Sequence, residues 1–260
     1  DSEVAVGIMK AETLEFSLNG LYSAKGQKVS GLQKVCVKEG GVEWNGNLYS
    51  ELCFTPSTCT DFFTLNEVPI GIGFHWQRNC RQSFHGALKL IIEDGRLLAV
   101  NIIAIEDYLV SVISSEMKAT SSPQLLRAHA VISRSWVYNQ SIRRHNAPRH
   151  TNSFSFVRRQ GSIVKWYNGN DHVLFDVCAD DHCQRYQGIG QAVLPQVAEA
   201  VQATRGQILT FEGALCDTRF SKCCGGVSES YDTCWEEQTF PYLSPVRDDQ
   251  THTDLPDLTN

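Results

Sequence analysis

A glutamate on the apolar side of a predicted helix is the residue in this sequence best suited to acid–base chemistry. In residues 105–117 the apolar residues recur at intervals of three and four, which predicts an amphipathic helix. Tyr108, Val112 and Glu116 are four residues apart, so they share one face of that helix. A carboxyl on a buried face must be neutralised, be paired or face a cleft. Burial raises the pKa of a carboxyl, and a general acid working near neutral pH requires a raised pKa.

The surroundings of Glu116 leave a catalytic and a structural interpretation open. Asp107 lies nine residues earlier, about 180° around a helix of 3.6 residues per turn, and is expected to face solvent. No second acidic residue shares the face of Glu116. In the structural alternative, Glu116 lies in the last turn and bonds a loop backbone or Arg134.

The cysteines and histidines form a second group of residues that could do chemistry. His172, Cys178, His182 and Cys183 lie within twelve residues, and three or four such ligands suit tetrahedral zinc. The competing interpretation is a set of disulfides in an oxidising envelope, which pairs Cys178 or Cys183 with a later cysteine. The later cysteines are Cys216, Cys223 and Cys234. The four early cysteines are predicted to form two disulfides or to be buried thiols; they are Cys36, Cys53, Cys59 and Cys80.

Strands and then two helices are predicted in front of the Cys/His segment. Residues 1–100 have the alternation and turn signals of strands, and the clearest hairpin joins residues 87–93 to 96–103 through Asp94-Gly95. The helix over 105–117 follows directly. Ser122-Pro123 then provides an N-cap and a first-turn proline for a second helix that runs to about Ser141. That helix is apolar over most of its circumference, which predicts burial.

The rest of the chain is predicted to mix strands and loops. After Asn146 the sequence is predicted to be loop-rich until a strand at 173–177. A helix at 197–204 that stops near Gly206 and strands at 207–211 and 215–220 are predicted to follow. The sequence therefore predicts an α+β fold with a strand-rich N-terminal part, two packed central helices and a mixed strand and loop C-terminal half.

Composition excludes several classes of protein. With 260 residues, 42% of them hydrophobic and 20% charged, the chain is neither disordered nor a coiled coil. No apolar run approaches the ~20 residues of a membrane span. The net charge of −6 argues against a nucleic-acid partner. The chain begins at Asp1 without a leader, which is expected of an exported protein whose signal has been removed or of a trimmed chain.

The two predicted helices contain specific motifs: AIEDYLVSVI at 104–113 with SEM at 115–117, and LRAHAVISRSW at 126–136. These motifs resemble the SpoIID/LytB domain, the family of stage II sporulation protein D and the amidase enhancers. Further segments follow in the family's order at 183–188, 203–206 and 220–226, so the resemblance covers about residues 85–250. His129 stands where the family usually has Gln, and Phe220 where Tyr or His is common.

The resemblance implies a peptidoglycan lytic transglycosylase with Glu116 as its catalytic acid. In that reaction a carboxylic acid protonates the oxygen between N-acetylmuramic acid and N-acetylglucosamine. The carboxylate then accepts the proton of the muramoyl C6 hydroxyl, which closes on C1 and leaves a 1,6-anhydro sugar. One carboxyl serves as acid and then base, whereas ordinary glycosidases need a second carboxylate about 5–9 Å away.

The resemblance also implies a set of substrate-binding residues, a domain division and a metal. Residues 86–250 form the catalytic domain, 1–85 a strand-rich region packed on it, and 251–260 a loose tail. No cofactor is needed for the chemistry, but a structural zinc is implied at His172, Cys178 and Cys183. The residues expected to bind the sugar or its lactyl carboxylate are Arg134, Gln184, Tyr186, Thr204, Arg205, Ser221, Gly225 and Gly226. In the alternative, either arginine pairs with an acid of the protein and the two glycines form a turn.

The implied partners are the glycan strands of peptidoglycan and a cell-wall amidase. Glycan strands that lack stem peptides are expected to be preferred. The implied location is exported, periplasmic or extracellular, at the cell envelope. Two alternatives remain open on the sequence: a wall-binding amidase enhancer without chemistry of its own, and a zinc-dependent wall hydrolase whose metal activates water.

Overall fold

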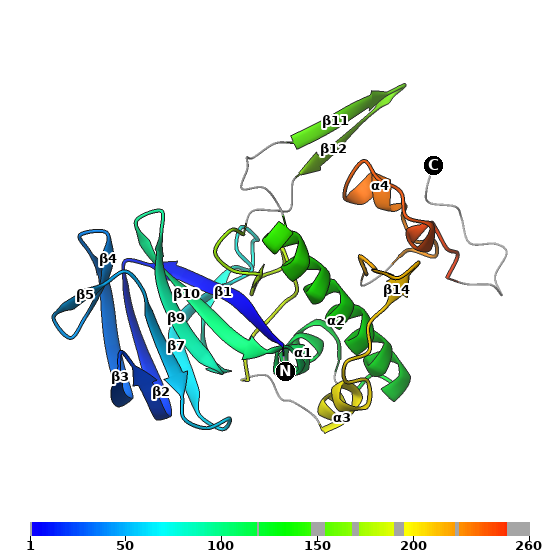
Figure 1. Cartoon of the computed structure of the whole chain (residues 1–260). Coiled ribbons are helices and arrows are strands. Elements are labelled where there is room, and N and C mark those ends of the chain that lie inside the picture. Colours follow the sequence, from blue (N-terminus) through cyan, green and yellow to red (C-terminus); the bar gives the residue numbers. More distant parts are fainter. Residues whose placement is uncertain are drawn as a thin grey trace.

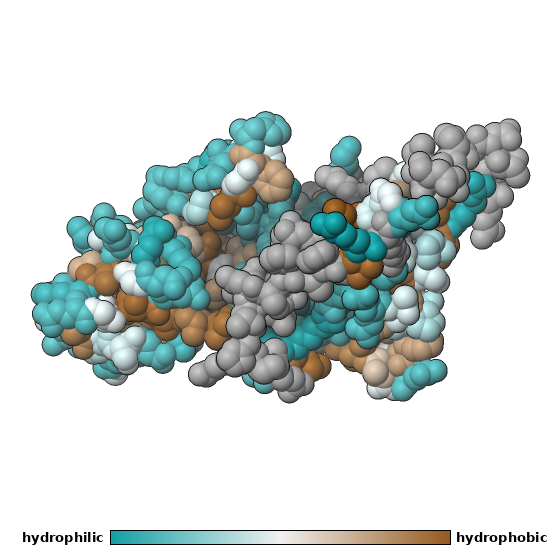
Figure 2. Space-filling model, turned by 90° about the horizontal axis from the view of Figure 1, so that it is seen from above, coloured by the Kyte–Doolittle hydropathy of each residue, from teal (hydrophilic) through white to brown (hydrophobic). Residues whose placement is uncertain are grey.

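The computed structural model describes residues 2–118, 120–146, 154–167, 172–189, 195–221 and 224–248. It confirms the α+β fold class, with an eleven-stranded sheet built mainly from the first hundred residues. Strands β2 to β5 lie at one end of the molecule and the helices at the other, and β1 and β10 run between them (Figure 1). Seen from above, the strand-rich end shows hydrophobic residues gathered between hydrophilic rims (Figure 2).

The large sheet has the order β13-β1-β10-β9-β6-β2-β3-β4-β5, and β7 pairs with β2 and β8. Its pairs are antiparallel except for β1 with β13. The strands are β1 (Glu3–Ala11), β2 (Thr13–Ala24), β3 (Gln27–Lys38), β4 (Gly41–Trp44), β5 (Asn47–Tyr49), β6 (Leu52–Pro56), β7 (Phe62–Ile70), β8 (Arg78–His85), β9 (Ala87–Glu93), β10 (Arg96–Ala104) and β13 (Val177–Cys178).

The predicted β9–β10 hairpin is confirmed, and it leads directly into the first helix. Arg96 pairs with Glu93, and the turn residues Asp94 and Gly95 have φ angles of 52° and 73°. Leu88 and Leu90 are completely buried. Because β10 ends at Ala104 and α1 begins at Ile105, the central strands of the sheet fix where this helix starts.

Two helices pack together next to the sheet. Helix α1 (Ile105–Glu116) buries the apolar face that its periodicity predicts. Helix α2 (Pro123–Asn146) begins at the predicted cap, where the Leu125 amide donates to the Ser122 hydroxyl at 3.3 Å. The predicted all-round burial of α2 holds only for its middle, because Leu125 and Ile142 near its ends are 46% and 50% exposed. The other helices are α3 (Pro195–Ala203), which packs on α1 and α2, α4 (Tyr231–Cys234) and a 3₁₀ turn at Pro241–Leu243.

The prediction of loops after Asn146 was wrong for part of that stretch. Strands β11 (Phe154–Arg159) and β12 (Ser162–Tyr167) pair in a separate antiparallel hairpin, turned at Gly161 with φ 82°. In Figure 1 this hairpin projects away from the large sheet and the helices. β-Branched and aromatic residues on both sides of Gln160-Gly161 were a hairpin signal in the sequence.

The strands predicted at 207–211 and 215–220 are too long. Only β14 (Thr210–Phe211) and β15 (Ala214–Leu215) pair. Beyond them the chain runs along α2, where the Thr218 hydroxyl donates to the Ile132 carbonyl at 2.7 Å. Side-chain bonds to a helix thus replace the expected strand ladder.

The large sheet crosses the predicted domain boundary near residue 85. Strand β9 pairs with β6, and β10 pairs with β1, so strands from both sides of the boundary belong to one sheet. The tail predicted at 251–260 lies outside the described residues. Within the described part of the chain, no helix is both long and apolar enough to cross a membrane.

Candidate functional site

Glu116 is the last residue of α1, and its side chain is half-buried. Its Oε1 accepts a hydrogen bond from the backbone N–H of Arg185 at 2.8 Å. Among the described residues, no cation forms an ion pair with this carboxylate and no second donor bonds it. The loop contact of the structural alternative is therefore present, but it uses one carboxylate oxygen and leaves the other available. Asp107 is exposed, as predicted.

The Arg185 amide is held in place by its two neighbours in the chain. The Gln184 side chain accepts from the Tyr108 hydroxyl at 3.2 Å and donates to the Ser133 carbonyl at 3.5 Å. The Tyr186 hydroxyl donates to Asn101 Oδ1 at 2.6 Å, and its ring stacks on Tyr108 at 5.1 Å. These bonds fix the segment behind α1, so the amide that contacts Glu116 is preorganised.

Four of the predicted sugar-binding residues have buried side chains with internal partners. Gln184 and Tyr186 are 1% exposed. The Thr204 hydroxyl donates to the Ala200 carbonyl at 2.9 Å. Arg134 is completely buried and pairs with an acid, as its alternative allowed: its Nε and Nη2 donate to the two oxygens of Glu106 at 2.9 and 2.7 Å. A glycan could reach these side chains only if the core opened, so their geometry indicates a positioning role.

The other predicted binding residues lie at the surface. Arg205 and Ser221 are exposed. Gly225 and Gly226 have φ angles of 70° and 107°, which favour glycine, and they form a turn next to the Val227–Arg247 bridge. The turn that the sequence left as the alternative is thus present.

The structure brings His172, Cys178, His182 and Cys183 together, and we call these four residues the Cys/His cluster. Their ligand atoms all lie within 4.8 Å of one another. His172 Nε2 lies 3.2 Å from His182 Nδ1, and Cys183 Sγ lies 3.5 Å from each of these nitrogens. Cys178 Sγ lies 4.0 Å from His182 Nδ1.

These separations suit a tetrahedral metal. With Zn–S near 2.3 Å and Zn–N near 2.0–2.1 Å, the edges of such a tetrahedron are about 3.3–3.8 Å. The pKa of the Cys178 thiol is lowered, mainly because the Cys183 thiol donates a hydrogen bond to its sulfur. A thiolate is the form of cysteine that binds zinc. His182 completes a set of which the resemblance implied only His172, Cys178 and Cys183.

None of the cysteines in the described part of the chain forms a disulfide. The four early cysteines are thiols, but they are not fully buried. Cys36 donates to the Glu43 carboxylate at 3.2 Å, and Cys59 is exposed. Cys223, one of the alternative disulfide partners, lies outside the described residues.

The Cys/His cluster and Glu116 are connected by one short segment of the chain. Cys183 is a member of the cluster, and Arg185, two residues later, donates to Glu116. Burial raises the pKa of the Tyr108 hydroxyl well above its usual value, and the charges of Cys183, Cys178 and Glu116 add to that rise. The loop that carries the cluster therefore also positions the carboxylate.

Two contributors to the site were not predicted: the backbone amide of Arg185 and the ring of Trp76. Arg185 acts on Glu116 through its backbone, and a backbone donor leaves no signal in residue type. Its guanidinium pairs with Asp181 at 2.7 Å and lies over the Trp76 ring, 5.4 Å from the centroid. The i,i+4 spacing of Asp181 and Arg185 was visible in the sequence, but the contact with Trp76 is between distant segments.

Buried His129 predicts a pH-dependent stability. Both its ring nitrogens are buried without a hydrogen-bond partner among the described residues, and the ring packs edge-on against Phe220 at 5.0 Å. Burial lowers the pKa of His129 to about 4. The unfolded chain takes up this proton near pH 6.5, so stability is complete above pH 6.5 and is lost as the pH falls toward 4. The expected loss between pH 7.5 and pH 5 is about 2 kcal/mol.

Urea unfolding at the two pH values measures this effect. His129→Gln removes the titrating group, so the stability lost between pH 7.5 and pH 5 is expected to be smaller than in wild type by about 2 kcal/mol. His145→Gln, which changes an exposed histidine on the same helix, is expected to keep the wild-type dependence. An equal loss in wild type and His129→Gln would show that His129 does not cause it.

Comparison with known proteins supports the resemblance seen in the helical motifs. A family model described as SpoIID, Stage II sporulation protein, matches residues 93–211. The chain is 26% identical over 151 residues to Stage II sporulation protein D of Bacillus subtilis, which covers 57% of this chain and 40% of that protein. The same protein of Bacillus amyloliquefaciens is 28% identical with the same coverage.

An uncharacterized protein of Brachyspira hyodysenteriae is 24% identical over 177 residues, which covers 68% of this chain and 41% of that protein. The chain thus spans about two fifths of the length of these curated relatives. The matched segment contains Glu116, the Cys/His cluster and helices α1 to α3. Over residues 93–211, this chain is therefore similar to the SpoIID family of stage II sporulation proteins.

Proposed function

We propose that this chain is a peptidoglycan lytic transglycosylase that cleaves the bond between N-acetylmuramic acid and N-acetylglucosamine. Similarity to the SpoIID family supports a role at the cell wall. The assignment of lytic transglycosylase chemistry rests on one observation: Glu116 is half-buried, held through one oxygen by a backbone amide, and not paired with any described cation. A carboxyl in that setting is oriented and still able to exchange a proton with a ligand.

In the proposed reaction, Glu116 donates its proton to the glycosidic oxygen and the leaving sugar departs as an alcohol. The carboxylate then accepts the proton of the muramoyl C6 hydroxyl as that oxygen bonds to C1. The Arg185 amide keeps the carboxyl in one orientation through both steps, which is the geometric requirement of general acid–base catalysis. A single carboxyl suffices because the nucleophile belongs to the substrate, and Asp181, an acid on the segment that contacts Glu116, is paired with Arg185.

Product analysis tests this function. Mass spectrometry of peptide-free glycan strands digested by the protein is expected to show 1,6-anhydromuramoyl ends, and strands that carry stem peptides are expected to be cleaved more slowly. Reducing muramic ends would indicate an ordinary hydrolase. A protein that binds the glycan, leaves it intact and stimulates a separate amidase would instead be the alternative, an amidase enhancer.

We propose that the Cys/His cluster holds a structural zinc ion. The four residues fit the metal, since two sulfurs and two ring nitrogens converge within 4.8 Å. When bound, zinc would join the end of β13 to the segment that ends in Cys183, and so stiffen the loop behind the Arg185 amide. The proposed chemistry needs no metal, because acid and base are the same carboxyl.

Removal of the metal is expected to destabilise the fold and reduce activity together. Wild type should contain about one zinc per chain by elemental analysis, and Cys178→Ser should contain little. A loss of about 3 kcal/mol would lower the melting temperature by about 10 °C in a chain of this size. Cys53→Ser, at a half-buried thiol of β6 whose sulfur lies 3.7 Å from the Thr55 hydroxyl, is the control and is expected to keep the wild-type melting temperature. If chelation removes activity while the melting temperature stays unchanged, the zinc-dependent hydrolase is favoured.

The proposed partner is the glycan strand of peptidoglycan, and the proposed location follows from it. The substrate lies outside the cytoplasmic membrane, so the protein would be exported and act at the cell envelope. The curated relatives are longer than this chain, and an amidase partner is a further proposal that binding of the two purified proteins would test.

A further inference from the structure

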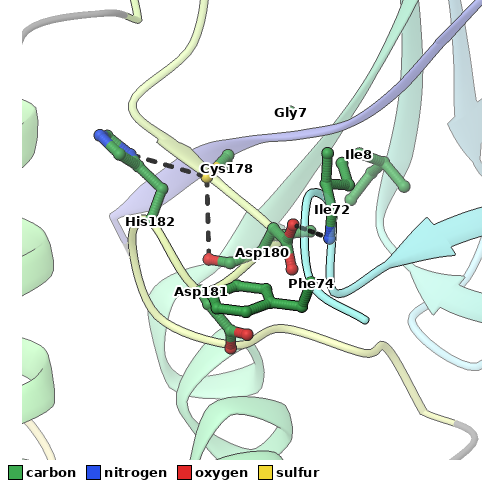
Figure 3. Close-up of a pocket in the computed structure, with 9 residues that line it drawn as sticks. Gly7, Ile8, Ile72, Phe74, Cys178, Asp180, Asp181 and His182 are labelled. Carbon is green, nitrogen blue, oxygen red and sulfur yellow. Dashed lines mark hydrogen bonds between the residues drawn. The ribbon is translucent and has the colours of Figure 1, made fainter. Parts of the chain in front are cut away.

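A pocket of about 480 Å³ lies next to the Cys/His cluster, on the side of the strand-rich region. Three segments line it: β1 with Gly7 and Ile8, the loop between β7 and β8 with Ile72 and Phe74, and residues 178–182. In Figure 3 the side chains of Ile72, Phe74, Asp180 and Asp181 lie on one side of Cys178, and His182 lies on the other. The loop and β1 are outside the matched family segment, so the pocket joins two regions of the chain.

The β7–β8 loop has a fixed shape. The Gly71 and Ile72 amides donate to the two carboxylate oxygens of Asp180 at 3.2 and 3.0 Å. The Gly73 amide donates to the Gln77 side chain at 2.9 Å. Gly71 has φ 67°, and a Cβ atom there would clash with the Trp76 ring, so the tryptophan packs directly on the loop backbone. A loop held by this many bonds presents its side chains in a defined geometry.

This rigid loop exposes an apolar and aromatic surface. Phe74 is 52% exposed and Ile72 is 55% exposed, although both line a pocket. Phe74 stacks on Trp76 with a centroid distance of 5.5 Å and an interplanar angle of 14°. Exposed apolar groups on a rigid, hollowed surface are typical of binding sites.

The aromatic pair is connected to the proposed acid through one residue. The Arg185 guanidinium lies over the Trp76 ring, and the Arg185 amide donates to Glu116. Asp181, which lines the pocket, pairs with that guanidinium, so Arg185 links the wall of the pocket to the carboxyl. A glycan strand bound at Glu116 could extend into the pocket, where a second sugar ring would meet Phe74.

The charges at the pocket select the kind of sugar. Asp180 and Asp181 place two carboxylates on its wall, and each can accept further hydrogen bonds from hydroxyl groups. Asp181 is paired with the Arg185 guanidinium, whereas Asp180 has no cation partner among the described residues and repels an anion, so a ring that carries a lactyl carboxylate is disfavoured. The apolar face of a neutral pyranose ring matches Phe74, and the volume is within the range of about 300–1,000 Å³ that ligand pockets have.

We propose that this pocket is a glycan subsite that binds a neutral N-acetylhexosamine ring, which stacks on Phe74 and donates hydroxyl hydrogen bonds to Asp180 and Asp181. The proposal rests on the proposed function, of which it specifies a second point of substrate contact. In a peptidoglycan strand the ring with this chemistry is N-acetylglucosamine, which has no lactyl group.

Binding of the β-1,4-linked pentamer of N-acetylglucosamine to the full chain tests the subsite, measured by isothermal titration calorimetry. This probe lacks muramic acid, so it is bound without being cleaved by the proposed reaction. Phe74→Ala is expected to weaken binding about tenfold because the stacking surface is lost, and Phe74→Leu is expected to weaken it less. Leu32→Ala, at a 65% exposed residue of β3 that does not line the pocket, is the matched control and is expected to bind like wild type.

Two results would overturn the subsite. One is equal affinity of wild type and Phe74→Ala for the pentamer, with both variants folded by circular dichroism. The other is equal binding of an oligogalacturonate of the same length, since a carboxylate on every ring should be repelled. Neither result depends on catalysis. If the protein forms anhydromuramoyl products and Phe74→Ala binds the pentamer like wild type, the subsite alone is contradicted. If binding depends on Phe74 but no such products form, the catalytic proposal alone is contradicted.

Discussion

Glu116→Gln is expected to abolish the formation of 1,6-anhydromuramoyl ends from peptide-free glycan strands, with a rate at least about 10³-fold below wild type. General acid–base catalysis by one group contributes typically about 10²–10⁴-fold, and here the same group acts in both steps. Glutamine keeps an oxygen that can accept from the Arg185 amide, so the loop behind α1 should stay in place. Mass spectrometry of timed digests gives the rate, and the melting temperature should be close to that of wild type.

Asp107→Asn is the matched control for this variant. It also converts an acid to its amide on α1, but Asp107 is exposed on the other side of the helix. Its rate is expected to stay within about twofold of wild type, because surface substitutions of this kind have small effects. A Glu116→Gln protein that works at the wild-type rate would exclude Glu116 as the acid.

The second large effect is expected at Arg134, whose predicted role in sugar binding competes with the positioning role that the structure indicates. Arg134→Met should destabilise the fold by about 3–5 kcal/mol, since removing one partner of a buried ion pair leaves the other uncompensated. Glu106 would lose both its bonds, and the carbonyls of Val201 and Gln207 would each lose a donor. Urea unfolding of wild type and variant measures the difference.

Two further variants separate the ion pair from a general effect of substitution. Lys38→Met removes the cation of the exposed pair with Glu43 and is expected to change stability by less than about 1 kcal/mol. Adding Glu106→Gln to Arg134→Met should recover part of the loss, because the unpaired carboxylate is then absent. An Arg134→Met protein with wild-type stability and weak glycan binding would instead support the predicted contact with the lactyl carboxylate.

The predicted sugar-binding residues that are buried in the structure were chosen because their side chains can form hydrogen bonds. Residue type identified Arg134, Gln184 and Tyr186 as suited to hydrogen bonding, and all three do form hydrogen bonds. Their partners are Glu106, Tyr108 and Asn101, which belong to other segments of the core. A side chain that can bond a sugar can bond the protein equally well, and only the packed structure distinguishes the two.

Elements with a local sequence pattern could be predicted before the fold was known. The hairpin around Asp94-Gly95 and the helix that ends at Glu116 follow from alternation and from three-to-four spacing, because those patterns report which side of an element is buried. The Cys/His cluster was also visible, since its four ligands lie within twelve residues and need only one short loop to meet. The β11–β12 hairpin had a local signal of the same kind.

Contacts between distant segments could not be predicted in this way and are seen in the folded chain alone. Nothing in residue spacing pairs β1 with β10 and β13, places Asp180 on the amides of the 71–77 loop, or aims the Arg185 amide at Glu116. These contacts join residues that are about 70 to 170 positions apart, and each depends on the whole core packing in one arrangement. The acid could therefore be predicted from a helical face, whereas its orientation and the pocket beside it required the folded chain.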